Sequence, residues 1–342
     1  MDKLRTTNIL LLIIALPVLF FVLKTLSFIF IPLVFSLFIA ILLWPLIRWL
    51  QKKKIPKFIN ISIIVVLMLF FIVSMSVLIN LSTKEILASN TGFFEKADAK
   101  ISNFVLVIED YFQIERDNSV SAFRFYSEKI NYNSLASSLA SSLKNMLTMF
   151  LMTMFFAVLL LSESLNLHNV LQQFVIKERF ASIRVIARVE KDIITFIKVK
   201  FILSFFTGLG FTLACLLFDV SFPIFWGLVA FSLNFIQMIG SVVAVILMSI
   251  FALIEIDHPG TLLFFILVVT MVEVIIGGLL EPIFMGKSFA INVITILVML
   301  MFWGFLWGIP GMILSIPITA FLKIIFDQFP KTKLLSSLMA GK

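Results

Sequence analysis

The sequence predicts an all-α protein that crosses a membrane several times. Hydrophobic residues make up 61% of its 342 residues and charged residues only 13%, against roughly 45–50% and about 25% in soluble globular domains. The mean hydropathy is +1.14, and 40 residues are phenylalanine. The hydrophobic residues gather in runs, most of which approach or exceed the roughly 20 residues that a membrane-spanning helix needs. These observations exclude a water-soluble fold.

About eight hydrophobic helical segments account for most of the chain. No small-residue cleavage site follows the first segment, so we expect it to stay in the protein as a span rather than to be removed as a signal peptide. The segments fall at residues 8–23, 25–47, 59–81, 146–161, 201–218, 224–253, 261–280 and 289–326. The expected organisation is N-terminal membrane spans over 1–81, an external amphipathic helical segment over 82–145, and a C-terminal membrane region over 146–342 that includes a cytoplasmic basic amphipathic helical segment over 162–200.

The basic residues indicate which loops face the cytoplasm. The loop 48–57 carries five Lys or Arg and no acidic residue, so the positive-inside rule assigns this loop and the N-terminus to the cytoplasm. Residues 82–145 carry seven basic and eight acidic side chains, as an external segment can, whereas 162–200 carry seven basic and four acidic ones. The net charge of +8 therefore reflects membrane orientation and gives no reason to expect nucleic acid as a partner.

Two of the hydrophobic runs are longer than one crossing requires. The run 224–253 would measure about 45 Å as one straight helix, while the hydrocarbon core of a bilayer is about 30 Å thick. Each long run has helix-breaking residues near its middle, at 234–240 and at 303–311. If both runs fold back as re-entrant hairpins, residues 254–260 lie outside and the C-terminus lies in the cytoplasm. Two tilted, kinked helices are the alternative, and the sequence leaves both open.

Two carboxylates within apolar surroundings are candidates for a substrate or ion pathway. Glu273 and Glu281 are eight residues apart, which on one α-helix puts them within about 80° of each other. Pro282 removes a backbone donor, so carbonyls freed beside Glu281 can coordinate a cation or bind a polar solute. A desolvated carboxylate can also take up a proton. The structural alternative is that Glu281 caps the helix break and forms an ion pair with Lys287.

Polar and small residues at the breaks are further candidates. Asn234 and Gln237 can bind solute or can hydrogen-bond a neighbouring helix. Lys198 and Lys200 precede the fifth run, where snorkelling of the ammonium group to the membrane surface is the default expectation. The residues expected to act as helix breaks and hinges are Gly240, Gly277, Gly278, Pro282, Gly286, Gly304, Gly308, Pro310 and Gly311.

No arrangement of residues supports an enzyme. The two histidines, His168 and His258, are isolated from acidic and thiol side chains at the spacings of metal ligands. The sequence contains no Gly-x-Ser-x-Gly, no HExxH and no GxxxxGK[ST] phosphate-binding loop. We therefore expect no catalytic residues, no metal, no cofactor and no direct use of ATP.

The order of these features resembles the autoinducer-2 exporter (AI-2E) family, a group of permease-like bacterial inner-membrane proteins. The resemblance rests on Leu280–Ser288 followed by Trp307–Pro317, extends to Asn234–Gly240, and covers the whole chain. It implies a secondary transporter that exports a small polar solute such as autoinducer-2 across the cytoplasmic membrane. The implied partners are the lipid bilayer, a small-molecule or ion substrate and further copies of the chain. A sodium/proton antiporter, also known in the family, and a non-transporting membrane scaffold are the alternatives.

Some positions depart from the family pattern. Gln237 and Ser241 stand where members usually have proline, so this break is expected to be less sharp. Ile276 stands where many members carry an acidic residue. Glu273 lies one turn earlier on roughly the same helix face and can substitute for that residue.

Overall fold

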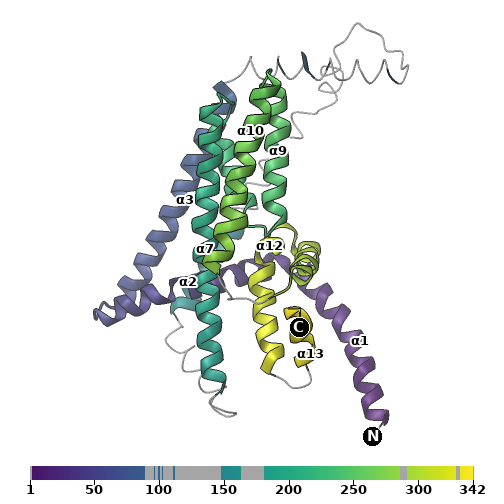
Figure 1. Cartoon of the computed structure of the whole chain (residues 1–342). Coiled ribbons are helices and arrows are strands. Elements are labelled where there is room, and N and C mark those ends of the chain that lie inside the picture. The colour runs from purple at the N-terminus through teal and green to yellow at the C-terminus, as the bar shows by residue number, and fades with distance from the viewer. Residues whose placement is uncertain are drawn as a thin grey trace. The chain divides into compact units, whose positions relative to one another are not determined.

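The structure is a computed structural model, and it describes residues 2–88, 96, 99–100, 102, 111, 148–162, 181–285, 291–328 and 332–341. All regular secondary structure in these residues is helical (Figure 1), which confirms the predicted all-α class. Five of the described helices are long and apolar enough to cross a membrane, and four shorter apolar helices accompany them. Helices satisfy their own backbone hydrogen bonds, as lipid requires. The chain is a multi-pass membrane protein.

The helices form two compact units, each assembled from segments far apart in the sequence. The segments predicted from the sequence, 1–81, 82–145 and 146–342, describe membrane topology, and the division into two units does not test them. Most of 82–145 and all of 163–180 lie outside the described residues. The first unit comprises residues 1–69, 147–199 and 285–342, and the second comprises residues 70–146 and 200–284. Two helices continue from one unit into the other, α3 (Lys57–Ala88) and α7 (Ala181–Leu217).

Two apolar clusters hold the first unit together. In one, the rings of Trp303 and Trp307 pack at a tilt of 46° with centroids 5.1 Å apart, and the indole N–H of Trp307 donates to the Leu23 carbonyl at 3.0 Å. The other cluster packs the helix Thr148–Ser162 against its neighbours. Between apolar helices in lipid, such close packing supplies the association energy that the hydrophobic effect supplies in water. The unit's helices are α1 (Asp2–Thr25), α2 (Ser27–Lys52), Thr148–Ser162, α12 (Val293–Gln328), α13 (Lys333–Ala340) and the adjoining parts of α3 and α7.

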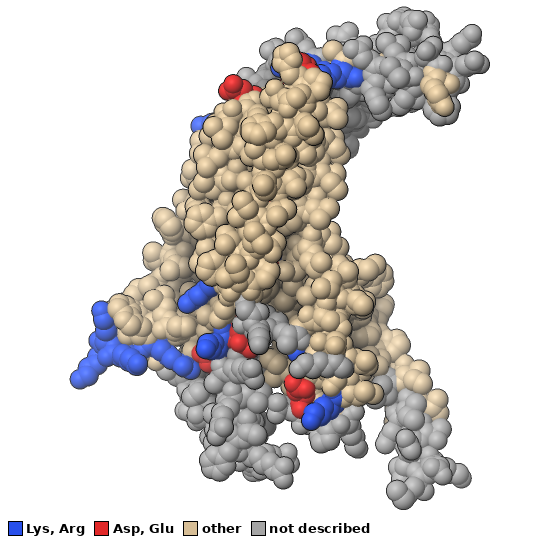
Figure 2. Space-filling model, viewed as in Figure 1, with Lys and Arg blue, Asp and Glu red and all other residues tan. Residues whose placement is uncertain are grey.

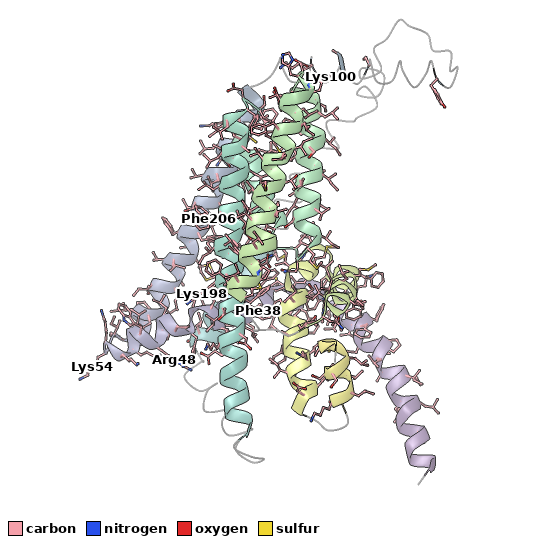
Figure 3. All side chains as sticks on the ribbon, in the orientation of Figure 1. Phe38, Arg48, Lys54, Lys100, Lys198 and Phe206 are labelled. Atoms are coloured by element: carbon pink, nitrogen blue, oxygen red, sulfur yellow. The ribbon has the colours of Figure 1, made fainter. Side chains whose placement is uncertain are left out.

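The second unit packs its helices through small residues. A Cβ atom on Gly208 of α7 would lie only 2.7 Å from the carbonyl oxygen of Gly227, so these glycines let two helices approach closely. Large apolar side chains such as Phe206 of α7 (Figure 3) instead point outward and are half exposed. Figure 2 shows that the visible face of these helices lacks charged side chains over most of its length. Besides parts of α3 and α7, the unit contains α8 (Pro223–Leu233), α9 (Ile239–Glu255), α10 (Pro259–Glu273), the π-helix η1 (Val274–Leu280) and most of α11 (Glu281–Met285).

The first long run, 224–253, folds as a helical hairpin. A turn at residues 234–238 separates α8 from α9, and Met238 within it has a φ of 61°. The rings of Phe222 and Trp226, at the start of α8, lie 5.8 and 4.9 Å from the ring of Phe251 near the end of α9. Because the first residues of one helix meet the last residues of the other, the two helices are antiparallel. The hairpin alternative, and not the single kinked helix, describes this run.

The second long run also breaks where the sequence predicts. Gly308, inside α12, has φ 64° and ψ −145°, a conformation that favours glycine. The backbone N–H of Asn292, just before α12, donates to the Met339 carbonyl of α13 at 2.9 Å, while Ser336 of α13 donates to the Asp327 carboxylate at 2.6 Å. The eight residues of α13, about 12 Å of helix, therefore connect the two ends of α12. A straight helix of 36 residues would separate those ends by about 54 Å.

At both breaks a glycine allows a close contact between two parts of the backbone. A Cβ atom on Gly240 would collide with the Leu233 carbonyl oxygen, and one on Gly311 would collide with the Trp303 carbonyl oxygen. In each case the chain turns back onto the last turn of the preceding helical piece. Only a residue without a side chain fits at such a contact.

Candidate functional site

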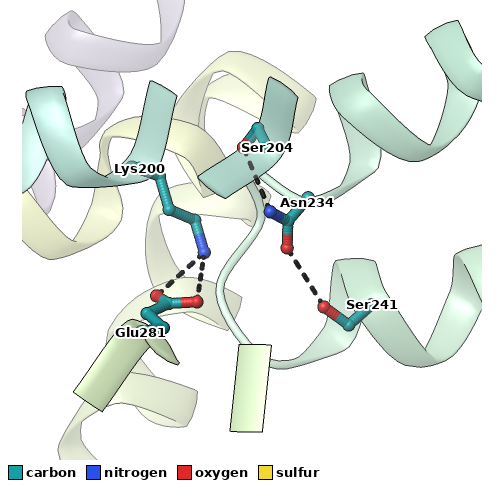
Figure 4. A network of polar contacts seen from close by, with 5 residues as sticks. All are labelled: Lys200, Ser204, Asn234, Ser241 and Glu281. Atoms are coloured by element: carbon teal, nitrogen blue, oxygen red, sulfur yellow. Dashed lines mark hydrogen bonds and ion pairs between the residues drawn. The ribbon is translucent and has the colours of Figure 1, made fainter. Parts of the chain in front are cut away.

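Buried polar side chains gather at one place in the second unit (Figure 4). Figure 4 draws Lys200, Asn234 and Glu281 together with Ser204 and Ser241. Lys200, Asn234, Glu273 and Glu281 are respectively 2%, 1%, 7% and 6% exposed. In this unit, residues 201–217 of α7, the whole of α8 and the whole of α10 carry no charged side chain except Glu273. Charges buried within membrane-spanning helices are costly unless they are paired, so their partners identify what the cluster can do.

Helix α7 contributes one polar stripe to the cluster. Lys200, Ser204 and Thr207 follow one another at helical spacing, so they project from one face of the helix. All three are at most 2% exposed. Four residues beyond Thr207, the same face continues with Phe211 and enters the apolar core of the unit.

The Lys200 ammonium and the Glu281 carboxylate form a buried ion pair. Lys200 Nζ donates to both carboxylate oxygens of Glu281, at 3.0 and 3.1 Å. The snorkelling expected from the sequence is therefore wrong for Lys200, because its charge is compensated inside the unit and does not need the membrane surface. Lys198, two residues earlier and on a different face of α7, is exposed (Figure 3).

Asn234 connects three helices through both ends of its amide. Its Nδ2 donates to Ser204 Oγ of α7 at 3.1 Å, and its Oδ1 accepts a hydrogen bond from Ser241 Oγ of α9 at 3.2 Å. Asn234 itself is the C-terminal cap of α8. The turn of the hairpin is thus fixed to α7 by side-chain hydrogen bonds.

Glu273 is the last residue of α10, where the helix changes to the wider π-helix η1. A Cβ atom on Gly277 would lie 3.4 Å from Glu273 Oε2 and 3.6 Å from Ser241 Oγ, so both oxygens face this glycine. The Ser241 hydroxyl has only one hydrogen, which it donates to Asn234 Oδ1. Its oxygen also lies beside the Glu273 carboxyl, close enough for a hydrogen bond in which that oxygen accepts. The Glu273 carboxylate has no closer hydrogen-bond partner among the described residues.

The structure brings most of the candidate pathway residues together. Glu273 and Glu281 both act electrostatically on Lys200, although the π-helix between them changes the helical phase that the sequence argument assumed. Gln237 lies in the hairpin turn, where its Oε1 is buried without a hydrogen-bond partner among the described residues. Lys287 lies outside the described residues, so its predicted pairing with Glu281 stays a prediction.

The predicted break residues lie at three places. Gly240 follows the first hairpin turn, and Gly304, Gly308, Pro310 and Gly311 surround the break in α12, where Gly304 packs against Met312. Gly277 and Gly278 are in the π-helix and Pro282 is in α11, whereas Gly286 lies outside the described residues.

Comparison with known proteins decides the family. The sequence profile of the AI-2E family transporters matches residues 9–331. The chain belongs to this family. It is 26% identical over 303 residues to the AI-2 transport protein TqsA of Escherichia coli (strain K12), covering 88% of this chain and 86% of the relative. A putative transport protein of Borreliella burgdorferi is 28% identical over 328 residues, covering 92% and 85%. The family expected from the motifs is confirmed, and the chain is a membrane transporter.

In this AI-2E family transporter, two of the three stretches that indicated the family contact the same stripe of α7. Glu281 of the Leu280–Ser288 stretch pairs with Lys200, and Asn234 of the Asn234–Gly240 stretch bonds Ser204 one turn later. The sequence argument missed Lys200, Ser204 and Ser241 as members of the cluster. Polar residues at helical spacing on an otherwise apolar helix are the signal that could have identified the α7 stripe.

Proposed function

We propose that this chain is a secondary transporter that exports a small polar solute, of the autoinducer-2 kind, across the cytoplasmic membrane. The observation that carries the proposal is the buried polar cluster around Lys200, Glu281 and Asn234 in a unit otherwise built from apolar helices. The relative TqsA is named as an AI-2 transport protein, which supports the choice of solute.

The cost of the cluster argues against a purely structural role. An ion pair within a membrane protein gives little net stability, because the desolvation of both charges offsets most of their attraction. A scaffold has no need for such a pair, whereas a pathway for a polar solute needs donors and acceptors away from the membrane surface. The hydroxyl groups of Ser204 and Ser241, together with the Asn234 amide, offer groups that a polar solute can displace. The sequence has no ATP-binding loop, which favours secondary transport.

The contacts of Lys100 support an orientation with both termini in the cytoplasm. Lys100 belongs to the segment 82–145, which the charge distribution assigns to the outside. Its ammonium donates to the carbonyls of Leu253 and Ile256 and pairs with Asp257 at 2.8 Å, beside the loop between α9 and α10 (Figure 3). The loop 254–260 is then also outside, as the hairpin arrangement requires. The assembly into homo-oligomers and the absence of a nucleic-acid partner stay predictions from the sequence.

Cysteine accessibility tests this orientation. In a background with Cys215 replaced by alanine, we expect His258→Cys, at an exposed position of the loop 254–260, to react with an impermeant maleimide added outside intact cells. A cysteine at position 287 should react only in inverted vesicles. The reverse pattern would contradict the hairpin topology and favour eight single crossings.

Transport measurements in vesicles test the function. We expect inverted membrane vesicles that contain the protein to accumulate autoinducer-2, and we expect Glu281→Gln to reduce the initial rate at least tenfold. Glu255→Gln is the matched control, because Glu255 bonds Ser221 at the far end of the hairpin and takes no part in the cluster. Full transport in Glu281→Gln would refute the site. Sodium-dependent proton flux without autoinducer-2 accumulation would favour a sodium/proton antiporter.

A further inference from the structure

The charges of the buried cluster do not balance. Among the described residues of the second unit, Lys200, Glu273 and Glu281 are the charged side chains that are buried. One ammonium group faces two carboxylates, so the fully ionised trio carries one net negative charge. An unpaired charge in such surroundings is far more costly than a neutral group. The cluster therefore needs one further positive charge or one bound proton.

The ammonium group is committed to Glu281 and not to Glu273. Lys200 Nζ bonds both oxygens of Glu281, whereas the group within hydrogen-bonding reach of Glu273 is the neutral Ser241 hydroxyl, which supplies no positive charge. The charged groups that reach Glu273 electrostatically are Lys200 and Glu281, which come from α7 and α11. Their charges nearly cancel as a pair, so Glu273 is the carboxylate left without compensation.

The hydrogen-bond directions around Glu273 suit a protonated carboxyl group. Asn234 donates its Nδ2 hydrogens toward Ser204, so its Oδ1 accepts the single hydrogen of Ser241. Ser241 then presents only lone pairs to Glu273. The lone pairs of an ionised Glu273 carboxylate would face those of Ser241 Oγ and repel them. A protonated Glu273 carboxyl can instead donate its O–H to Ser241 Oγ. With the hydrogens in this order, the network is complete when Glu273 carries a proton.

A proton fits this position better than a metal cation does. A hard metal ion takes six or more oxygen ligands, and no three His, Cys, Asp or Glu side chains within the described part of the chain lie close enough to hold one. The Lys200 ammonium acts electrostatically at both carboxylates and repels a second cation. A proton needs only one carboxylate oxygen and one acceptor.

We propose that Glu273 is the proton-binding carboxyl of this transporter and that release of its proton is coupled to movement of the solute. The coupling part rests on the proposed function, while the proton site stands on the cluster alone. No group other than Glu273 changes covalently: its O–H bond breaks, and the proton leaves to water on one side of the membrane. Glu281 and Lys200 stay an ion pair throughout.

Infrared difference spectroscopy of the reconstituted protein tests the proton site. We expect wild type to show a protonated-carboxyl C=O band that disappears as the pH is raised. The band should be absent in Glu273→Gln and should persist in Glu255→Gln. Addition of sodium at constant pH should leave the band unchanged. Persistence of the band in Glu273→Gln, or its loss on addition of sodium, would overturn the proposal.

The Glu273→Gln variant is suited to this test because it copies the neutral carboxyl in size and hydrogen bonding, so the folded state should survive. An unchanged helical circular dichroism spectrum and a single gel-filtration peak check this. If the variant fails to fold, Glu273→Asp serves instead, since the proposal requires its C=O band to stay but to shift in frequency. An unshifted band in Glu273→Asp would also overturn the proposal.

A pH gradient across the same proteoliposomes tests the coupling. We expect the gradient to accelerate autoinducer-2 transport at least fivefold in wild type and in the Glu255→Gln control, and to have no effect in Glu273→Gln. A variant that remains driven by the gradient would refute the role of Glu273. Absence of autoinducer-2 transport in wild type itself would refute the proposed function and leave the spectroscopic result to decide the proton site.

Discussion

If Lys200 is replaced by methionine, the Glu281 carboxylate loses the two hydrogen bonds that compensate its charge, at 3.0 and 3.1 Å. Glu281 is 6% exposed, so water cannot replace the lost ammonium group without a rearrangement of the helices. Removal of one partner from a buried pair costs about 3–5 kcal/mol, roughly two to four orders of magnitude in the unfolding equilibrium constant. We expect Lys200→Met to lower the free energy of unfolding by this amount.

Lys200→Met and Glu281→Gln should lower the free energy of unfolding by different amounts. Lys200→Met leaves two buried carboxylates with no ammonium group, whereas Glu281→Gln leaves the ammonium group beside Glu273, which acts on it electrostatically. Glu281→Gln should therefore cost less than Lys200→Met. The double substitution removes both partners and leaves no unpaired Glu281 carboxylate, so it should be more stable than Lys200→Met alone.

Reversible unfolding in mixed micelles, followed by tryptophan fluorescence across a detergent titration, measures these free energies. Lys198→Met is the control, because Lys198 is exposed on the same helix. A cost for Lys200→Met no larger than that of the control would refute the reasoning. So would a double variant that is less stable than Lys200→Met.

Three further results are expected. Gly277→Ala should abolish the pH-gradient response, because its methyl group would lie against the Glu273 carboxyl. It should not reduce stability, because the contact is at an ordinary distance and alanine favours the helix. Gly240→Ala should lower the free energy of unfolding by about 1–3 kcal/mol, because its methyl group collides with the carbonyl at the end of α8. The Lys100 ammonium, by its hydrogen bond and its charge, holds the pKa of Asp257 below its ordinary value, so the stability from this contact should be present at neutral pH and lost as the pH falls below about 4.

Each of these results has its own check. Gly260→Ala, where the added methyl group meets nothing within 4 Å, controls both glycine variants in thermal unfolding and transport. A normal gradient response in Gly277→Ala, or wild-type stability in Gly240→Ala, would contradict the geometry described. For the third, Lys100→Gln and wild type should differ in thermal stability at pH 7 and converge in acid. If the difference in thermal stability between Lys100→Gln and wild type grew as the pH fell, the predicted pH dependence of the Lys100–Asp257 contact would be contradicted.

The helical class and the positions of the breaks could be predicted because both depend on local properties of the chain. Apolar runs show themselves by composition, and residues such as Gly308 and Pro310 interrupt a helix wherever they stand. The sequence could not decide between a hairpin and a kinked helix, since that choice depends on the contact of Phe251 with residues at the other end of the run.

Only part of the buried polar cluster could be predicted from the sequence. Glu273, Glu281 and Asn234 are recognisable as polar interruptions of apolar runs. The partner of Glu281 could not be identified, because Lys200 lies 81 residues away along the chain and resembles a snorkelling lysine at the start of a span. The π-helix has no sequence signature beyond its two glycines, so the helical phase between the carboxylates could not be derived either.

The row from Glu273 through Ser241 and Asn234 to Ser204 can hold its hydrogens in two opposite orders. When the carboxyl loses its proton, Ser241 gains by turning its hydrogen toward the new charge, and the Asn234 amide can then rotate by half a turn so that its nitrogen faces Ser241. Neither rotation needs a backbone change. The departure of one proton from α10 thereby reverses the polarity of the bond that fastens the hairpin turn to α7, and a single side-chain amide works as a relay between three helices.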